Sequence, residues 1–306
     1  KSLKVQQPTR STLFDICFGY LKLNSTITNK NFKNWHSSSN KETLVMGVIN
    51  VTPDSFSDGG KYLSIKNATE RAQALLEEGA DILDIGGEST RPGAKPVDVS
   101  DELDRVIPVI QEVRKFSLNS LISVDTYKSQ VAYESIKAGA DIINDISGLR
   151  FDKSMVQIIS KHNVPVVIMH MKGNPETMQN SPHYGNIIDE IIKFFKYRIK
   201  KAKSIGVKDK QIILDPGLGF GKTVEDNFSI IRHLNRMCSL GYPVLIGPSR
   251  KSFIGSVLSL STGNRLEGTS AAVSACILNG ARMVRVHDVL EIKRVVKIIE
   301  RIRTAK

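Results

Sequence analysis

Eight short apolar segments, each as long as a buried strand, recur at regular intervals through most of the chain. They fall at residues 44–50, 82–86, 121–125, 141–145, 165–170, 211–215, 243–247 and 283–287. Between them, apolar residues recur every three or four positions, which is the spacing of an amphipathic helix. Eight strand–helix units over about 260 residues imply a parallel sheet closed into a (β/α)8 TIM barrel, an α/β fold in a single domain.

A doubly wound open sheet is the alternative fold that the same alternation allows. Such a sheet carries a glycine-rich nucleotide-binding turn after its first strand, and residues 50–60 do not form one. The next segment instead places Ile65, Ala68, Ala72 and Leu75 on one face of a helix. Gly79 then ends that helix just before the second strand, as a helix-breaking glycine does.

Composition and charge exclude several classes of protein. The 306 residues are 41% hydrophobic, and no apolar run reaches the roughly 18 residues of a membrane helix. The net charge of +12 would suit a nucleic acid, an acidic surface or an anionic substrate, but seven of the 43 basic residues lie within residues 1–41. No basic stripe interleaved with aromatic residues follows, so we expect neither a nucleic-acid nor a membrane partner.

The three cysteines, Cys17, Cys238 and Cys276, lie far apart and form no zinc-ligand spacing. An odd count argues against a disulfide framework, so a reducing compartment such as the cytoplasm is expected.

Residues 1–41 are rich in Ser, Thr, Asn and Lys and show little periodicity. We interpret them as an irregular N-terminal extension or linker ahead of a barrel domain at residues 42–306. A transit peptide is one alternative, and a short hairpin around Phe32 and Trp35 that plugs the barrel bottom is another. Because the chain starts at Lys1, a fragment of a longer chain or a processed product is expected.

Polar side chains stand at the carboxyl end of every predicted strand, where barrels of this kind form their active sites. They are Asn50, Glu88, Ser89, Thr90, Arg91, Asp125, Asn144, Asp145, His170, Asp215, Ser249, Arg250, Lys251, Arg285 and His287. One polar strand end is most often a helix cap, but eight that converge on one mouth predict an active site.

Two kinds of side chain make up this set. Hydrogen-bond donors, including Arg91 and Arg285, suit a phosphate or pyrophosphate, since a guanidinium matches phosphate oxygens. Acceptors at Asp125, Asn144 and Asp215 suit an edge rich in N–H groups, such as that of a pterin or guanine. The expected ligand therefore has an anionic end and a heterocyclic end.

One glycine-rich run imitates nucleotide-binding motifs. Residues 215–223 resemble a P-loop, but Pro216 stands where that motif needs its first glycine. The dinucleotide pattern also fails, because its third glycine would fall on Lys222. Neither motif is therefore assigned.

Several long strings resemble those of dihydropteroate synthases, in the order of that family. They are MGVINVTPDSFSDGG (46–60), DIGGESTRPGA (84–94), SVDTYKS (123–129), IINDISG (142–148), MHMKGNPETMQ (169–179), LDPGLGFGKT (214–223), GPSRKSFIG (247–255) and RVHDV (285–289). The resemblance covers about residues 43–304, and only the extension before Thr43 departs from it.

The resemblance implies a site in three parts. Its pterin-binding residues are Asp125, Asn144, Met169, Asp215, Gly247 and Lys251. Its pyrophosphate-binding residues are Asn50, Thr90, Arg91, Arg285 and His287, with Asn50 also a ligand of Mg2+. Its p-aminobenzoate-binding residues are Phe56, Pro92, Phe220 and Ser252, although the first three could equally be loop-packing residues. The catalytic residues would be Asp58, Lys251, Arg285 and His287.

The implied reaction is a transfer in folate biosynthesis that sulfonamides inhibit. A pterin pyrophosphate ester would lose pyrophosphate, and the amine of p-aminobenzoate would attack the resulting cation. A homodimer and a fused upstream pterin pyrophosphokinase domain are also implied. The first rival is a related barrel that transfers a methyl group from a reduced folate, which would not need Arg285 or His287. The second is a non-catalytic module that binds an anion or a nucleic acid.

Overall fold

A computed structural model describes residue 28 and residues 31–38, 42–52 and 60–305 of the chain. Two residues expected in the site, Phe56 and Asp58, lie outside this part.

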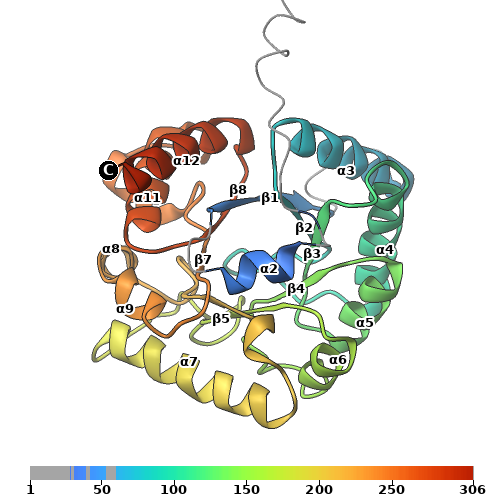
Figure 1. Ribbon diagram of the computed structural model, residues 1–306, viewed down its shortest axis with the longest axis horizontal. Helices are drawn as coiled ribbons and strands as arrows, with labels where there is room; N and C mark the ends of the chain where they lie inside the picture. The colour runs from blue at the N-terminus through green and yellow to red at the C-terminus, as the bar shows by residue number, and fades with distance from the viewer. Residues whose placement is uncertain (1–27, 29–30, 39–41, 53–59, 306) are drawn as a thin grey trace, which may run out of the picture.

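Eight parallel strands form the barrel at the centre of Figure 1. They are β1 (Leu44–Asn50), β2 (Ile82–Gly86), β3 (Leu121–Asp125), β4 (Ile142–Asp145), β5 (Val166–Met169), β6 (Ile212–Asp215), β7 (Leu245–Ile246) and β8 (Met283–Val286). Their order around the sheet is β6-β5-β4-β3-β2-β1-β8-β7. The circle closes between β6 and β7 through one bridge, Leu214 to Val244. The expected barrel is therefore confirmed, with a narrow seam at this closure.

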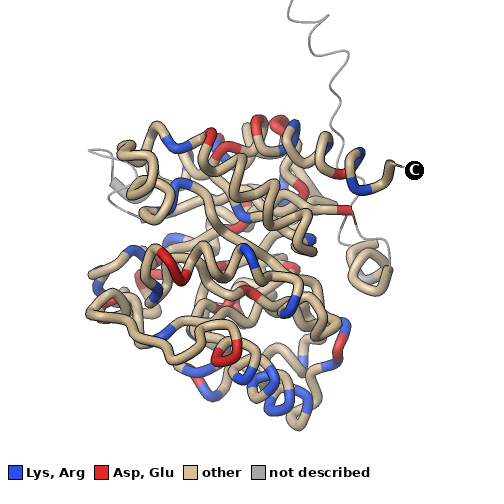
Figure 2. The backbone as a smooth tube through the Cα atoms, turned by 90° about the vertical axis from the view of Figure 1, so that its left-hand side faces the viewer, with Lys and Arg blue, Asp and Glu red and all other residues tan. Residues whose placement is uncertain are grey.

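The helices surround the strands as an outer ring (Figure 1). They are α3 (Gly60–Glu77), α4 (Val99–Phe116), α5 (Ser129–Ala138), α6 (Met155–His162), α7 (Ile187–Ser204), α8 (Val224–Arg232), α9 (Leu234–Cys238), α10 (Ser252–Leu258), α11 (Leu266–Leu278) and α12 (Val289–Thr304), with 3-10 turns η2 (Asp209–Gln211) and η3 (Thr262–Asn264). Among the described residues, no helix is both long and apolar enough to cross a membrane. Lys and Arg are spread over the surface and include a concentration along α7 at the lower edge of Figure 2.

The strands alternate between two environments, because successive side chains of a strand point to opposite faces. One set packs outward against the helices, for example Val45, Leu83 and Ile122. The other points into the barrel, where every strand adds an apolar side chain to one buried layer. That layer consists of Leu44, Met46, Ile82, Leu121, Ile142, Val167, Ile213, Leu245 and Met283. Two residues further along the strands, the inward side chains become mostly polar, and this second layer carries the site.

A helix closes the bottom of the barrel, where the extension was interpreted chiefly as a linker. Helix α2 (Phe32–Ser37) lies across the strands in Figure 1. Phe32 and Trp35 stack with their ring centroids 5.2 Å apart and join the inner apolar layer. Trp35 Nε1 donates to Glu42 O over 2.8 Å, and His36 Nε2 lies 2.9 Å from Ile212 O. The expected plug is thus present, but as a helix and not as a hairpin.

Strand β7 is shorter than the expected 243–247. Pro243 has no N–H to donate to a neighbouring strand. Val244 pairs with β6 through one isolated bridge, and on the other side its carbonyl accepts the backbone N–H groups of Arg282 and Met283. The two residues left pair with β8, Leu245 with Met283 and Ile246 with Val284.

Candidate active site

A buried ion cluster forms the floor of the barrel mouth. Arg285, on β8, donates from Nε to Asp84 Oδ2 over 2.6 Å and from an Nη to Asp125 Oδ2 over 2.9 Å. Asp84 is fully buried on β2, and Asp125 ends β3. Burial raises the pKa of Asp125 above its usual range, Arg285 opposes that rise, and Asp84 adds to it. Arg285, expected among the pyrophosphate-binding residues, is thus paired with Asp125, expected among the pterin-binding residues.

The sequence analysis missed Asp84, although it lies within a quoted string. The signal was available, because alternation along β2 puts Asp84 inside the barrel once Ile82 is assigned to the inner layer. The same step of two leads from Leu121 to Ser123, and from Ile142 to Asn144.

Asn144 supplies a free acceptor beside this cluster. Its Nδ2 donates to Asp84 Oδ2 over 3.2 Å. Its Oδ1 is buried and has no hydrogen-bond partner among the described residues, and the same holds for Asp84 Oδ1. Buried polar atoms are nearly always hydrogen-bonded. Two unpartnered oxygens at one place therefore fit a ligand that presents N–H groups.

Asp215 ends β6 as a buried carboxylate with a fixed orientation. Its Oδ1 accepts the backbone N–H of Gly217 over 2.7 Å. Gly217 has a φ of 68°, and a Cβ there would lie 2.2 Å from His170 O, so only glycine fits. Burial raises the pKa of Asp215 to about 6, while the Gly217 hydrogen bond, Lys222, Lys251 and Arg285 act against the rise. The carboxylate is therefore ionised at neutral pH.

Lys251 immediately precedes α10, and its side chain lies against Phe220 of the loop after β6. Its Nζ lies 4.2 Å from the centroid of the Phe220 ring, close enough for a cation–π contact. Burial lowers the pKa of Lys251 to about 8, and Arg285 adds to this, whereas Asp215 and Asp125 oppose it. The ammonium stays mostly protonated at neutral pH.

Lys222 is a buried lysine that was not among the residues expected in the site. Its Nζ lies 2.9 Å from Phe220 O, 3.2 Å from His170 O and 3.1 Å from His170 Nδ1. Burial lowers its pKa to about 7, against the attraction of Asp215. Burial also lowers the pKa of His170 well below its usual value, so the imidazole is neutral and can accept from Lys222. Lys222 thus holds the loop after β6 to the end of β5.

His287 follows β8 and is held by Ser249. The backbone N–H of His287 donates to Ser249 Oγ over 3.2 Å, and the same oxygen lies 3.0 Å from ring Nδ1. Ser249 can then donate its own proton to Nδ1, which leaves the proton of the neutral ring on Nε2. Burial lowers the pKa of His287 to about 4, and Arg285 and Arg250 add to the effect. His287 is therefore a neutral hydrogen-bond donor.

An apolar wall covers one side of the mouth. Met169 and Phe220, both expected in the site, belong to a buried cluster with Ile146, Met171 and Met178. The sequence analysis did not assign these last three residues. Such a wall suits the face of a flat aromatic ligand.

The remaining expected residues lie around the rim. Asn50 ends β1 and is half-buried, opposite Gly86 of β2. Thr90 is half-buried, while Arg91, Pro92 and Ser252 are exposed. A Cβ at Gly247 would lie 3.8 Å from Arg285 Cβ, so this glycine lines the floor. None of the described contacts joins Arg91 to Arg285 or His287.

No group of three or more His, Cys, Asp or Glu side chains in the described part of the chain is arranged to hold a metal ion. A metal at this mouth would need most of its ligands from water or from a bound substrate.

Comparison with known proteins relates this mouth to one enzyme family. The model of the pterin binding enzyme family matches residues 46–287. The dihydropteroate synthase of Bacillus subtilis is 49% identical over 263 residues, which cover 86% of this chain and 90% of that protein. The folate synthesis bifunctional protein of Arabidopsis thaliana is 43% identical over 263 residues, which cover 81% of this chain and 54% of that protein. The crystal structure of Yersinia pestis dihydropteroate synthase with a sulfonamide drug complex has a TM-score of 0.82 at 41% identity, and the match covers 86% of this chain and 95% of that one.

Proposed function

The chain belongs to the dihydropteroate synthase family of pterin-binding enzymes, transferases of folate synthesis, and we propose that its barrel mouth divides the work of that reaction among the residues described above. The substrates are 6-hydroxymethyl-7,8-dihydropterin pyrophosphate and p-aminobenzoate, and the products are 7,8-dihydropteroate and pyrophosphate. The observation that carries the assignment of the pterin end is the buried, unpartnered Oδ1 of Asn144.

The pterin lies in the floor of the mouth. Asp215 and Asn144 accept from its N–H groups, and Lys251 donates to its carbonyl and ring nitrogen. Asp125 completes the acceptor set, while Met169 and Gly247 border the ring. Each hydrogen bond to a charged partner contributes roughly 1.5–3 kcal/mol. Together they orient the ring and its reacting methylene.

The pyrophosphate lies toward Arg285 and His287. Arg285 brings a guanidinium whose charge Asp84 and Asp125 already balance in part, and His287 brings its Nε2 proton. Asn50, Thr90 and Arg91 complete the anion side from the rim. These donors stabilise the negative charge that grows on the leaving group, an electrostatic contribution that is often the largest in catalysis.

The p-aminobenzoate lies between the rim and the apolar wall. Phe220 provides the ring contact, while Pro92 and Ser252 border the entrance. Phe56 and Asp58, the other residues expected for this part of the site, lie outside the described residues.

The reaction proceeds by dissociative substitution. The bond between the pterin methylene and the pyrophosphate oxygen breaks, and both electrons leave with the pyrophosphate. The resulting cation is delocalised over the pterin, where the carboxylate of Asp215 and the carboxyl group of Asp125 stabilise it. The aryl amine then attacks the methylene carbon and loses a proton to solvent. No strong general base is needed, because an aryl amine is nucleophilic without one.

Mg2+ is the proposed cofactor, with Asn50 as its protein ligand. Mg2+ typically keeps several waters and binds a few protein oxygens together with substrate phosphates. One amide oxygen at the end of β1 fits this pattern. When bound, the ion would neutralise charge on the pyrophosphate.

Pyrophosphate release from the pterin ester tests the proposal, with and without p-aminobenzoate and Mg2+. Release that depends on p-aminobenzoate, together with dihydropteroate in the product, supports it. Methyl transfer from a reduced folate without pyrophosphate release would support the rival barrel instead.

We also propose that the chain forms a homodimer, is fused to a further domain and acts in the cytoplasm. The exposed apolar side chains Val257, Leu258 and Leu260 follow one another at the end of α10, and Leu278 of α11 is also exposed. We place a second copy of the chain on this surface, and light scattering tests the dimer. The name of the bifunctional relative, and the 54% of its length that the match covers, support a second fused enzyme, which we propose to be an upstream pterin pyrophosphokinase. The free Cys238 and Cys276 suit the reducing cytoplasm.

A further inference from the structure

The loop between β2 and α4 carries three residues of the proposed site but few internal anchors. Residues 89–96 include Thr90, Arg91 and Pro92, and none of the eight is buried. Within the loop, the N–H of Ala94 donates to Arg91 O over 3.0 Å. The N–H of Gly93 reaches Pro175 O over 3.1 Å. The position of this loop must therefore be set mainly at its two ends.

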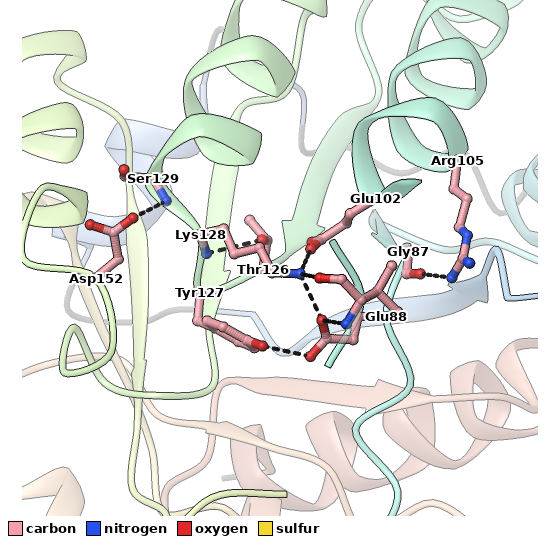
Figure 3. Close-up of polar contacts among 10 residues, drawn as sticks. Gly87, Glu88, Glu102, Arg105, Thr126, Tyr127, Lys128, Ser129 and Asp152 are labelled. Carbon is pink, nitrogen blue, oxygen red and sulfur yellow. Dashed lines mark hydrogen bonds and ion pairs between the residues drawn. The ribbon is translucent and has the colours of Figure 1, made fainter. Parts of the chain in front are cut away.

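Glu88 joins those two ends. It follows β2 and is buried, and its Oε2 accepts the backbone N–H of Val97 over 2.8 Å. Its Oε1 accepts the Tyr127 hydroxyl over 2.8 Å. One carboxylate thus ties the start of the loop both to its last residue and to the segment after β3 (Figure 3).

Lys128 anchors the tie to the barrel. Its Nζ lies 2.7 Å from Glu88 Oε2 and 2.6 Å from Val97 O, and it also pairs with Glu102 of α4 (Figure 3). Gly87 lets α4 come close to this point, because a Cβ there would lie 3.0 Å from Glu102 Cγ and 2.8 Å from Val106 Cγ2. The loop, α4 and the end of β3 therefore meet at one ammonium.

This cluster is poorly explained as a source of stability. Burying ion pairs carries a desolvation penalty that their attraction does little more than offset, so apolar residues often serve stability equally well. Glu88, Lys128 and Glu102 together have one negative charge in excess, and burial raises the pKa of Glu102. Such a cluster does fix the relative positions of the segments that it joins, because charged hydrogen bonds constrain geometry more tightly than apolar contacts do.

We infer that Glu88 and Lys128 are positioning residues for the transfer reaction, which hold the ends of residues 88–97 so that Thr90, Arg91 and Pro92 stand over the bound ester. The inference rests on the proposed function for the role of those three residues. The contact of Glu88 with Val97, Tyr127 and Lys128 is independent of the proposed function, because its effect on the loop can be measured without substrate.

The test compares Glu88→Ala with Glu88→Gln. Alanine removes the tie but leaves Lys128 paired with Glu102, whereas glutamine keeps an oxygen for Val97 and Lys128. Glu134→Ala is the control, because it removes an exposed ion pair to Lys137 on neighbouring α5. Amide hydrogen exchange of residues 89–97 reports the loop. Initial rates and calorimetry with free pterin report the site.

Glu88→Ala should speed exchange across the loop and lower kcat/KM by about 10- to 100-fold, as small misplacements of substrate-binding groups do. Free pterin should bind within about threefold of the wild type, since this variant leaves the buried acceptors of the floor intact. Glu88→Gln should recover most of the rate, and Glu134→Ala should change nothing. Tyr127→Phe, which removes one hydrogen bond to Glu88, is the milder second variant. It should also speed exchange across the loop and lower kcat/KM, each by less than Glu88→Ala does.

Unchanged exchange in Glu88→Ala would overturn the tie. Faster exchange with unchanged kcat/KM would overturn the positioning role. Failure of the unmodified chain to make dihydropteroate would overturn the proposed function and, with it, the positioning role, while the exchange comparison would still decide the tie.

Discussion

Arg285 and Asp84 form an ion pair inside the barrel, with Nε 2.6 Å from Oδ2, and Asp84 is completely shielded from solvent. The guanidinium therefore already has carboxylate partners before any pyrophosphate binds. It is built into the floor that Asn144 and Asp125 share. The two ends of the proposed substrate meet at this one side chain.

Arg285→Ala should weaken the binding of both free pterin and its pyrophosphate ester. Removing the guanidinium leaves two buried carboxylates without their partner, which is strongly destabilising and disturbs the floor. We expect a loss of about 10-fold or more for each ligand, since a lost charged hydrogen bond costs roughly 1.5–3 kcal/mol. Calorimetry with the two ligands measures this. Unchanged affinity for free pterin would show that Arg285 serves the anion alone.

His287→Ala should weaken only the ester. His287 contacts Ser249 and not the acceptor set of the floor, so free pterin should bind as before. A hydrogen bond to a charged phosphate is worth roughly 1.5–3 kcal/mol, or about 10- to 150-fold in affinity. Ser249→Ala should show a smaller loss, because it frees the ring without removing it. Equal losses for pterin and ester in His287→Ala would contradict the assignment.

Asp215→Asn should stabilise the fold while it impairs pterin binding. Burial raises the pKa of Asp215 from 3.8 to about 6, so the ionised form destabilises the folded state at neutral pH. A neutral amide avoids this, with a gain of up to about 3 kcal/mol. The gain should be complete above pH 6 and should vanish as the pH falls below 3.8, where the wild-type carboxyl is protonated in both states. Denaturant unfolding across this range measures it.

In the same variant, pterin affinity should fall at least about tenfold. The NH2 group of the asparagine replaces an acceptor oxygen, so a buried donor would face a donor of the ligand. Wild-type affinity would mean that Asp215 only holds the Gly217 turn.

Trp35→Ala should destabilise the barrel without reaching the chemistry. Trp35 is buried in the inner apolar layer, far along the strands from the mouth. A buried Trp→Ala change costs about 3–5 kcal/mol. Unfolding by denaturant should show this loss, while kcat/KM of the folded enzyme stays within a few-fold. Asn34→Ala, at an exposed position of the same helix, is the control. Unchanged stability in Trp35→Ala would mean that the plug is dispensable.

A sulfonamide should bind weakly to the free chain and more tightly once pyrophosphate and Mg2+ are present. None of residues 89–96 is buried, and the anion should draw Thr90 and Arg91 inward and bring Pro92 beside Phe220. Binding of the two ligands is then coupled, typically by about 1–3 kcal/mol or 5- to 150-fold. Calorimetry at fixed Mg2+, with and without pyrophosphate, measures the coupling. Equal affinities would indicate a preformed pocket.

The spacing of the apolar segments predicted the barrel, because a strand and its carboxyl end can be recognised from the residues of the segment itself. Asp215 and Asn144 were recognised as strand ends for this reason. Asp84 was missed because it precedes its strand end by two residues, and only the inward register reveals it. The length of β7 also depended on a tertiary detail, the missing N–H of Pro243.

The helix at Phe32–Ser37 could not be predicted from its own sequence. Six residues are too few for an isolated helix to be stable in water, and this one forms where the barrel bottom receives Phe32 and Trp35. The tie between Glu88 and Lys128 was hidden for a similar reason. Forty positions separate the two residues, and the spacing carries no sign of the contact.

The seam between β6 and β7 gives the bound ligand a part in the architecture. Backbone pairing there amounts to the single Leu214–Val244 bridge. Asp215 stands on one side of the seam and Lys251 on the other. A pterin hydrogen-bonded to both would span, with its own atoms, the stretch of circumference that the backbone leaves almost open. In this barrel a bound substrate would therefore reinforce the closure that the Leu214–Val244 bridge already makes.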